Sequence, residues 1–184
     1  MQEKENSRIM KNVVAIVQAR VGSERLPGKI LKKISNLSLI EWVIKRLKKS
    51  KKIKKIILAT TRFKSDDILK KVAKKNRVSI YRGKSNDVLS RFYQAAKKSK
   101  SNTIIRVCAD NPFIDYEQIN LLIKIFLSKN YDYVCNHQNK QNSNYADGFG
   151  AEIFSFSVLK KLNRVAKSKI HREHVTSYIW DNLK

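Results

Sequence analysis

The chain has 184 residues, of which 42% are hydrophobic, and this fits one globular domain and excludes a disordered chain. No apolar run approaches the roughly 20 residues of a membrane span and no signal-peptide pattern opens the chain, so a cytoplasmic location is expected. The net charge of +25 raises nucleic acid as a partner, but no basic segment interleaved with aromatic residues is present. We therefore expect no specific nucleic-acid partner. We attribute most of the charge to a compositional bias toward lysine, which supplies 29 of the 40 basic residues.

Strands and helices are predicted to alternate along the chain, after a polar and flexible leader at 1–12. Apolar runs predict strands at 13–19, 54–61, 78–82, 103–109, 131–136 and 148–154. Helical spacing of apolar residues predicts helices at 39–49, 66–75, 87–98, 116–128, 157–164 and 171–182. This order predicts an α/β fold, a doubly wound and mostly parallel sheet in a single domain over 13–184. In such a sheet the first and fourth strands can be neighbours, at the point where the strand order reverses.

The first predicted strand leads directly into a basic loop that contains glycine. Three cations and three turn-forming residues follow the strand: Arg20, Arg25 and Lys29, with Gly22, Pro27 and Gly28. A loop at the carboxyl end of a central strand, with free backbone N–H groups and cations, suits a polyphosphate. It is not an ATPase P-loop, because five residues separate the glycines instead of four and Ile30 replaces the Ser or Thr. The alternative is a plain strand-to-helix connection with surface charge.

Asp110 is the second candidate position, because it ends the fourth predicted strand and precedes Asn111 and Pro112. If the first and fourth strands are neighbours, Asp110 and the basic loop face the same crevice. A carboxylate there can hold Mg²⁺ together with waters and phosphate oxygens. The alternative is that Asp110 caps a turn.

Structural roles are the simpler interpretation of several other groups. Asp87 and Arg91, at i and i+4, fit a surface ion pair, and Ser85 or Asn86 fits the cap of the helix at 87–98. Arg106 is expected to pair with a carboxylate in the sheet, and Asp115 to cap the helix at 116–128. Cys108 and Cys135 lie in separate predicted strands and are expected to be reduced. The three histidines lack metal-ligand spacing.

Five blocks of sequence, in order, resemble the sugar-activating cytidylyltransferases, which include the CMP-acylneuraminate and CMP-Kdo synthetases. The blocks are QARVGSERLPGK at 18–29, LATT at 58–61, YRGKSNDVLSRFY at 81–93, RVCADNPFID at 106–115 and REHVT at 172–176. The likeness is strongest to the branch named spore coat polysaccharide biosynthesis protein F. It covers roughly 12–180.

This resemblance implies a Rossmann-like nucleotide-diphospho-sugar transferase fold and transfer of CMP from CTP to a sugar, with Mg²⁺ as cofactor. The implied acceptor is an acidic sugar for surface polysaccharide, pyrophosphate is released, and homodimers are common in the family. The implied catalytic residues are Arg20, Arg25, Lys29 and Asp110, with Asp110 as the metal ligand. The implied nucleotide-binding residues are Gln18, Ala19, Arg20, Gly22, Ser23, Lys29, Thr60 and Arg82. The implied sugar-binding residues are Asp87, Asn111, Asp147, Glu152, Arg172, Glu173 and His174.

Members of this family usually continue beyond the REHVT block, with another strand and an acidic cluster that helps to complete the metal site. We therefore expect a domain that lacks this C-terminal segment, with Asp147 and Glu152 as the available substitutes. Three alternatives follow. They are an inactive nucleotide-binding domain, a glycosyltransferase-like protein, and a basic nucleic-acid-binding protein. The second would carry an Asp-x-Asp motif, which 110–112 is not.

Overall fold

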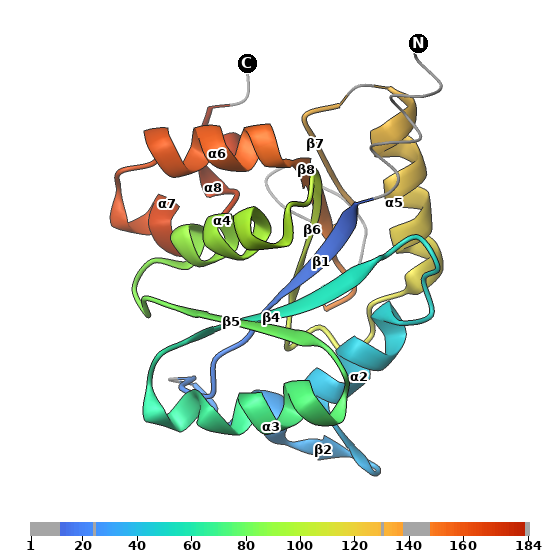
Figure 1. Ribbon diagram of the computed structural model, residues 1–184, viewed down its shortest axis with the longest axis vertical. Helices are drawn as coiled ribbons and strands as arrows, with labels where there is room; N and C mark the ends of the chain where they lie inside the picture. The colour runs from blue at the N-terminus through green and yellow to red at the C-terminus, as the bar shows by residue number, and fades with distance from the viewer. Residues whose placement is uncertain (1–11, 24, 130, 138–147, 183–184) are drawn as a thin grey trace.

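A six-stranded sheet forms the centre of the molecule (Figure 1). The computed structural model describes residues 12–23, 25–129, 131–137 and 148–182. The strand order is β5-β4-β1-β6-β8-β7. These strands are β1 (Val13–Gln18), β4 (Lys55–Thr61), β5 (Ser79–Gly83), β6 (Thr103–Cys108), β7 (Tyr133–Cys135) and β8 (Glu152–Ser155). Strands β4, β1, β6 and β5 pair in parallel, whereas β8 is antiparallel to both β6 and β7. The predicted α/β, mostly parallel sheet is confirmed.

Helices cover both faces of the sheet (Figure 1). One face packs against α2 (Leu39–Leu47), α3 (Ile68–Lys75) and α5 (Tyr116–Ser128). The other packs against α4 (Val88–Ser99), α6 (Phe156–Val165) and the short α8 (Ser177–Asp181), while the short α7 (Lys169–Glu173) contacts α4 and α8. The smaller elements are the 3₁₀ turns η1 (Lys29–Leu31) and η2 (Lys64–Asp67) and a hairpin of β2 (Lys33–Ile34) and β3 (Leu37–Ser38). The sequence analysis did not predict this hairpin.

The reversal of strand order lies between β1 and β6, as predicted. The chain adds β4 and β5 on one side of β1 and then returns to place β6 on its other side. Gln18 is in register with Cys108 across this pair, so the loops that follow the two strands leave the same edge of the sheet. Central β1 is fully covered from Val13 to Val17, which explains its unbroken run of apolar residues.

Three predictions about local structure are wrong in detail. The helix predicted at 171–182 is two short helices, because the chain turns at His174, whose backbone is extended (φ −101°, ψ 92°), and places Val175 in the core. Helix α4 is capped by Asp87, not by Ser85 or Asn86, and the Asp87 carboxylate accepts a hydrogen bond from the Ser90 N–H at 2.9 Å. The last strand begins at Glu152, because the turn at Gly148 (φ 87°) precedes it.

Other local predictions are confirmed. Asp115 caps α5, with its carboxylate accepting from the Glu117 N–H at 2.9 Å. Cys108 lies in β6 and Cys135 in β7, and the two form no disulfide. No helix among the described residues is long and apolar enough to cross a membrane. The predicted leader, apart from Asn12, and residues 138–147, which include Asp147, lie outside the described residues.

Candidate functional site

The basic loop leaves the carboxyl end of β1 and closes on itself. The Gly28 N–H donates to the Val21 carbonyl at 3.1 Å, and Gly28 has a φ of 69°, a conformation that favours glycine. Arg20 and Arg25 are exposed, and Lys29 opens η1 directly after this turn. The predicted cations therefore lie on one short loop, beside its exposed backbone.

Asp66 fixes this loop to the sheet, a role that the sequence analysis missed. Its buried carboxylate accepts from the Val21 N–H at 2.7 Å and also from the hydroxyl of Thr61 at the end of β4. The helix predicted at 66–75 places Asp66 in its first turn. In the structure Asp66 lies in η2 and α3 begins at Ile68. The position of the basic loop thus depends on a carboxylate 45 residues away from Val21.

Lys29 and Asp110 form an ion pair across the reversal point, with Nζ to Oδ2 at 3.0 Å. Their side chains are 38% and 42% exposed, so both remain accessible to solvent. This pair brings together the two positions that the sequence analysis placed in one crevice. Among the described residues no three His, Cys, Asp or Glu side chains cluster as a ready metal site. A single carboxylate fits Mg²⁺ in the mode in which substrate phosphates and waters supply the other ligands.

Two other predicted nucleotide ligands, Arg82 and Thr60, are held within the fold. The Arg82 guanidinium donates to the carbonyls of Thr61 at 2.7 Å and Phe63 at 2.9 Å, and it pairs with Asp67. Hydrogen bonds from Lys70 and then from Arg82 lower the pKa of Asp67. Thr60 is fully buried. The Thr60 side chain is covered and the Arg82 guanidinium is already bonded within the fold. The roles of both residues in nucleotide binding stay predictions.

Arg91 is almost fully buried beneath the loop after β5. Its Nη1 donates to the carbonyls of Lys84 at 2.6 Å and Ser85 at 3.0 Å, which shapes that loop. A Cβ at Gly83 would lie 2.7 Å from the Arg91 Cγ, so glycine is required for this approach. Burial, followed by the nearby charge of Arg20, lowers the pKa of Arg91. Gln18 Oε1 is also buried, and neither this atom nor the Arg91 Nη2 has a hydrogen-bond partner among the described residues.

Asp87 pairs with Arg172, not with Arg91 as its i, i+4 spacing indicated. Arg172 Nε lies 3.0 Å from Asp87 Oδ1 and its Nη2 lies 2.7 Å from Oδ2, a bidentate contact between α7 and the start of α4. Arg172 also donates to Asn163. Asp87 and Arg172, both predicted sugar ligands, therefore join the start of α4 to α7, and both side chains are largely covered.

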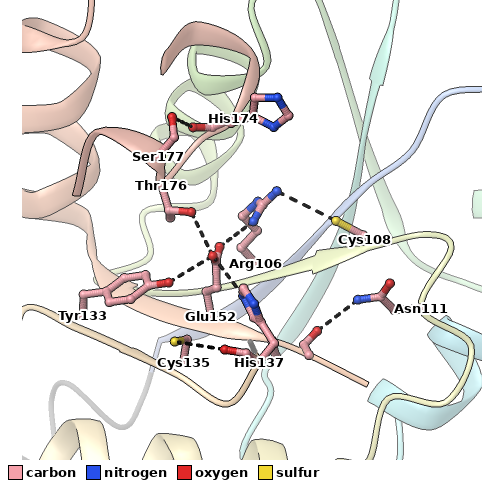
Figure 2. Close-up of polar contacts among 12 residues, drawn as sticks. Arg106, Cys108, Asn111, Tyr133, Cys135, His137, Glu152, His174, Thr176 and Ser177 are labelled. Carbon is pink, nitrogen blue, oxygen red and sulfur yellow. Dashed lines mark hydrogen bonds and ion pairs between the residues drawn. The ribbon is translucent and has the colours of Figure 1, made fainter. Parts of the chain in front are cut away.

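Glu152 is the centre of a buried polar cluster, shown in Figure 2. Its carboxylate accepts from Arg106 at 2.6 Å, Tyr133 at 3.0 Å and Thr176 at 2.8 Å, and lies 3.0 Å from His137 Nε2. Arg106 faces Glu152 across the β6–β8 register, as its predicted pairing with a sheet carboxylate requires. Burial alone would raise the pKa of Glu152, but the Arg106 charge and the His137 contact hold it at about 2.

The Glu152 cluster forms one wall of a pocket of about 460 Å³. His174, Ser177 and Trp180 from the α7–α8 region form much of the remainder. Of the predicted sugar-side residues, the structure thus brings Glu152 and His174 to one pocket. Asn111 lies nearby and donates to the Gly150 carbonyl at 3.2 Å, while Glu173 ends α7. Asp147 lies outside the described residues.

These features define a doubly wound α/β domain with a cationic loop and a carboxylate at the reversal of strand order, the usual place for a phosphorylated ligand. A sequence model described as "Cytidylyltransferase" matches residues 14–184. The chain belongs to the cytidylyltransferase family, and the fold and the resemblance stated above are confirmed.

Known proteins agree with this assignment. The chain is 39% identical over 170 residues to an uncharacterized protein of Methanocaldococcus jannaschii, covering 92% of this chain and 68% of that one. It is 31% identical to the spore coat polysaccharide biosynthesis protein SpsF of Bacillus subtilis, covering 92% and 70%. A cytidylyltransferase structure from Leptospira borgpetersenii superposes with a TM-score of 0.87 at 34% identity, covering 93% and 71%. A CMP-Kdo synthetase solved with CTP, at 15% identity and a TM-score of 0.70, shares the fold.

Proposed function

We propose that the protein transfers CMP from CTP to a hydroxyl of an acidic sugar, in Mg²⁺-dependent formation of a precursor for surface polysaccharide. The observation that carries the proposal is the Lys29–Asp110 pair at the junction of β1 and β6. Membership of the cytidylyltransferase family supports the CMP transfer. The sugar class rests on relatives, including a 3-deoxy-manno-octulosonate cytidylyltransferase of Fusobacterium nucleatum that is 37% identical over 115 residues.

In this proposal the loop binds the triphosphate by charge and by backbone N–H groups. Arg20, Arg25 and Lys29 neutralise the phosphates and stabilise the charge that develops on pyrophosphate as it leaves. Lys29 exchanges its carboxylate partner for a phosphate oxygen, which frees Asp110 to act as the protein ligand of Mg²⁺. When bound, the metal supplies charge neutralisation at the phosphate oxygens. The chain contributes positioning and charge and does not need a covalent nucleophile.

On the acceptor side we propose the pocket beside Glu152. The ring of Trp180 offers an apolar face, and His174 and Ser177 offer polar groups for sugar hydroxyls. Glu152 already uses its oxygens on four side chains, so it is proposed to shape this pocket instead of binding the sugar itself. We also propose that the protein is a homodimer, as is common in the family.

Thermal unfolding with CTP, ATP, GTP and UTP, each with and without Mg²⁺, tests the nucleotide part. A ligand at 100 times its Kd adds about 2.7 kcal/mol of stability. The expected result is a Mg²⁺-dependent shift in Tm selective for CTP, which Lys29→Ala and Asp110→Ala abolish and the exposed control Lys33→Ala retains. Equal shifts with all four nucleotides indicate a general polyanion effect and contradict the proposal.

Pyrophosphate release with a panel of sugar acids and neutral sugars then tests the transfer. Release that requires an acidic sugar supports the proposed substrate class, and release with neutral sugars alone contradicts it. Selective CTP binding without release from any sugar supports the alternative of an inactive nucleotide-binding domain.

A further inference from the structure

One edge of the parallel sheet carries charges of both signs, whereas the other carries only positive charge. At one edge, strands β4, β5 and β6 end and lead into helices, and this edge holds the candidate site. At the opposite edge, helices α2, α3 and α4 end and lead into the same three strands. We call this second edge the amino edge and define it by the connecting segments 48–55, 74–79 and 97–103.

The amino edge is densely basic. Segment 48–55 contains six lysines, namely Lys48, Lys49, Lys51, Lys52, Lys54 and Lys55. Segment 74–79 adds Lys74, Lys75 and Arg77, and segment 97–103 adds Lys97, Lys98 and Lys100. The three segments contain no Asp or Glu. All of these cations except Lys52 are exposed, and Lys75 pairs with Glu41 of α2 at 2.7 Å.

The connections at the other ends of the same strands have a different composition. Segments 62–67, 84–87 and 109–115 hold three cations and five aspartates, namely Arg62, Lys64, Lys84, Asp66, Asp67, Asp87, Asp110 and Asp115. A lysine bias in the coding sequence acts on both sets of connections alike. The difference in charge between the two sets of connections therefore needs a cause that depends on position in the fold. A compositional bias toward lysine, to which the sequence analysis attributes most of the charge, does not explain this difference.

Helix dipoles explain only part of the contrast. Cations are favourable in the last turn of a helix, and the effect falls off within that turn. Helix α2 ends at Leu47, whereas Lys51, Lys52, Lys54 and Lys55 follow at least four residues later. Crowding like charges also costs stability through repulsion. A cluster that extends beyond the helix ends is thus better explained by an anionic partner.

The three segments form one continuous surface. Lys48 Nζ donates to the Asn76 carbonyl, which joins the first segment to the second. The Lys54 N–H donates to the Val13 carbonyl, and Asn12 donates to the Lys100 carbonyl at 2.7 Å, so the start of β1 bridges to the third. Between the first two segments lies a hollow of about 250 Å³ that is lined by Lys48, Lys54, Lys55 and Arg77.

We propose that the amino edge binds an anionic lipid bilayer and holds the protein at its surface with the candidate site facing away. Basic clusters of this kind bind anionic headgroups by charge alone. None of the exposed large hydrophobic residues of the described chain lies in the three segments, so the contact is electrostatic and superficial. Because the site opens at the opposite edge, soluble substrates reach it while the protein is bound.

A nucleic acid is a weaker match to the same surface. Proteins that bind single strands provide aromatic side chains on which bases stack, and the three segments contain no Phe, Tyr or Trp. The nearest rings are covered, since Lys98 lies over Tyr81 at 5.4 Å and Lys49 over Tyr116 at 5.5 Å. Eleven of the twelve cations are lysines, which lack the forked geometry with which arginine reads bases.

Cosedimentation of the full chain with lipid vesicles tests this proposal, which does not depend on the proposed function. The vesicles contain phosphatidylcholine alone or with 30% phosphatidylglycerol, at 50, 150 and 500 mM NaCl. The test variant changes Lys51, Lys54 and Lys55 to Gln. A control variant changes Lys71, Lys160 and Lys161 to Gln, which removes the same charge from exposed positions on α3 and α6. Circular dichroism and Tm verify that both variants fold.

The wild-type protein is expected to bind only the anionic vesicles and to be released at 500 mM NaCl. The test variant should lose about a hundredfold in affinity, at roughly fivefold per lysine. The control variant should lose less than about threefold. Equal losses in the two variants, or no binding to anionic vesicles, overturn the proposal. Tighter binding of a 20-nucleotide RNA or DNA than of vesicles, with the same loss in the test variant, overturns it in favour of nucleic acid.

Discussion

At the scale of single residues, Glu152 couples stability to pH. Its pKa lies at about 2 in the folded protein, against 4.5 for an unperturbed carboxyl. Because the folded pKa is depressed, the stabilisation is complete above pH 4.5 and is lost as the pH falls toward 2. Removing one partner of a buried ion pair leaves the other charge uncompensated. Glu152→Gln is therefore expected to cost about 3 kcal/mol at pH 7.

Urea unfolding of the wild type and of Glu152→Gln between pH 7 and pH 3 measures both effects. The variant should be less stable at pH 7, and its stability should fall less between pH 5 and pH 3. Glu41→Gln serves as a comparison, because the pKa of Glu41 also lies at about 2 but its partner Lys75 is 69% exposed. A Glu152→Gln variant as stable as the wild type at pH 7 would show that the buried pair contributes nothing net.

The sequence predicted which residue types form the site more reliably than the contacts they make. Lys29 and Asp110 meet as predicted, because the basic loop and the segment with Asp110 follow two strands whose pairing is set by the α/β alternation. The contacts of Asp66 with the Val21 N–H and of Arg91 with the Lys84 carbonyl were not predicted, because only the folded loops bring these backbone groups within reach. No residue spacing encodes a contact with a distant backbone N–H.

At the scale of elements, the bidentate Asp87–Arg172 contact ties α7 to the start of α4. Both side chains are less than a quarter exposed, and the geometry is that of a strong ion pair. A double-mutant cycle with Asp87→Asn and Arg172→Gln is expected to give a coupling energy of about 1 to 2 kcal/mol. Urea unfolding at low and high salt measures it. A coupling below about 0.3 kcal/mol would mean that packing alone holds α7 in place.

The end of the chain shows why helix prediction failed at this scale. The apolar spacing at 171–182 fits a single helix, but two tertiary demands interrupt it. Val175 is fully buried, and the Thr176 hydroxyl donates to Glu152 on β8 at 2.8 Å. The hydrogen bond depends on a residue 24 positions earlier in the chain, and the burial of Val175 depends on the assembled core. By contrast, the bounds of α5 match the prediction, because its cap and its apolar face are both local.

At the scale of the whole molecule, a charge of +25 acts on folding and on binding in opposite directions. Like charges repel in the compact state, and salt screens this repulsion, since the screening length falls from about 30 Å at 0.01 M to about 10 Å at 0.1 M. Added NaCl is thus expected to raise the Tm by several degrees, where 1 kcal/mol corresponds to about 2–4 °C for a chain of this size. The same salt should weaken binding at the amino edge.

Neutralising the amino edge tests whether this repulsion is local. If it is, the Lys51, Lys54 and Lys55→Gln variant should have a higher Tm than the wild type at 0.01 M NaCl, and the gap should close at 0.5 M. The Lys71, Lys160 and Lys161→Gln variant, with the same net charge, should gain less, because those lysines lie on α3 and α6, outside the three basic segments. Scanning calorimetry across the salt series measures both gaps. Equal gains would mean that repulsion depends on net charge alone. A larger gain at the amino edge would mean that the fold retains a destabilising cluster, as expected of a surface kept for an anionic partner.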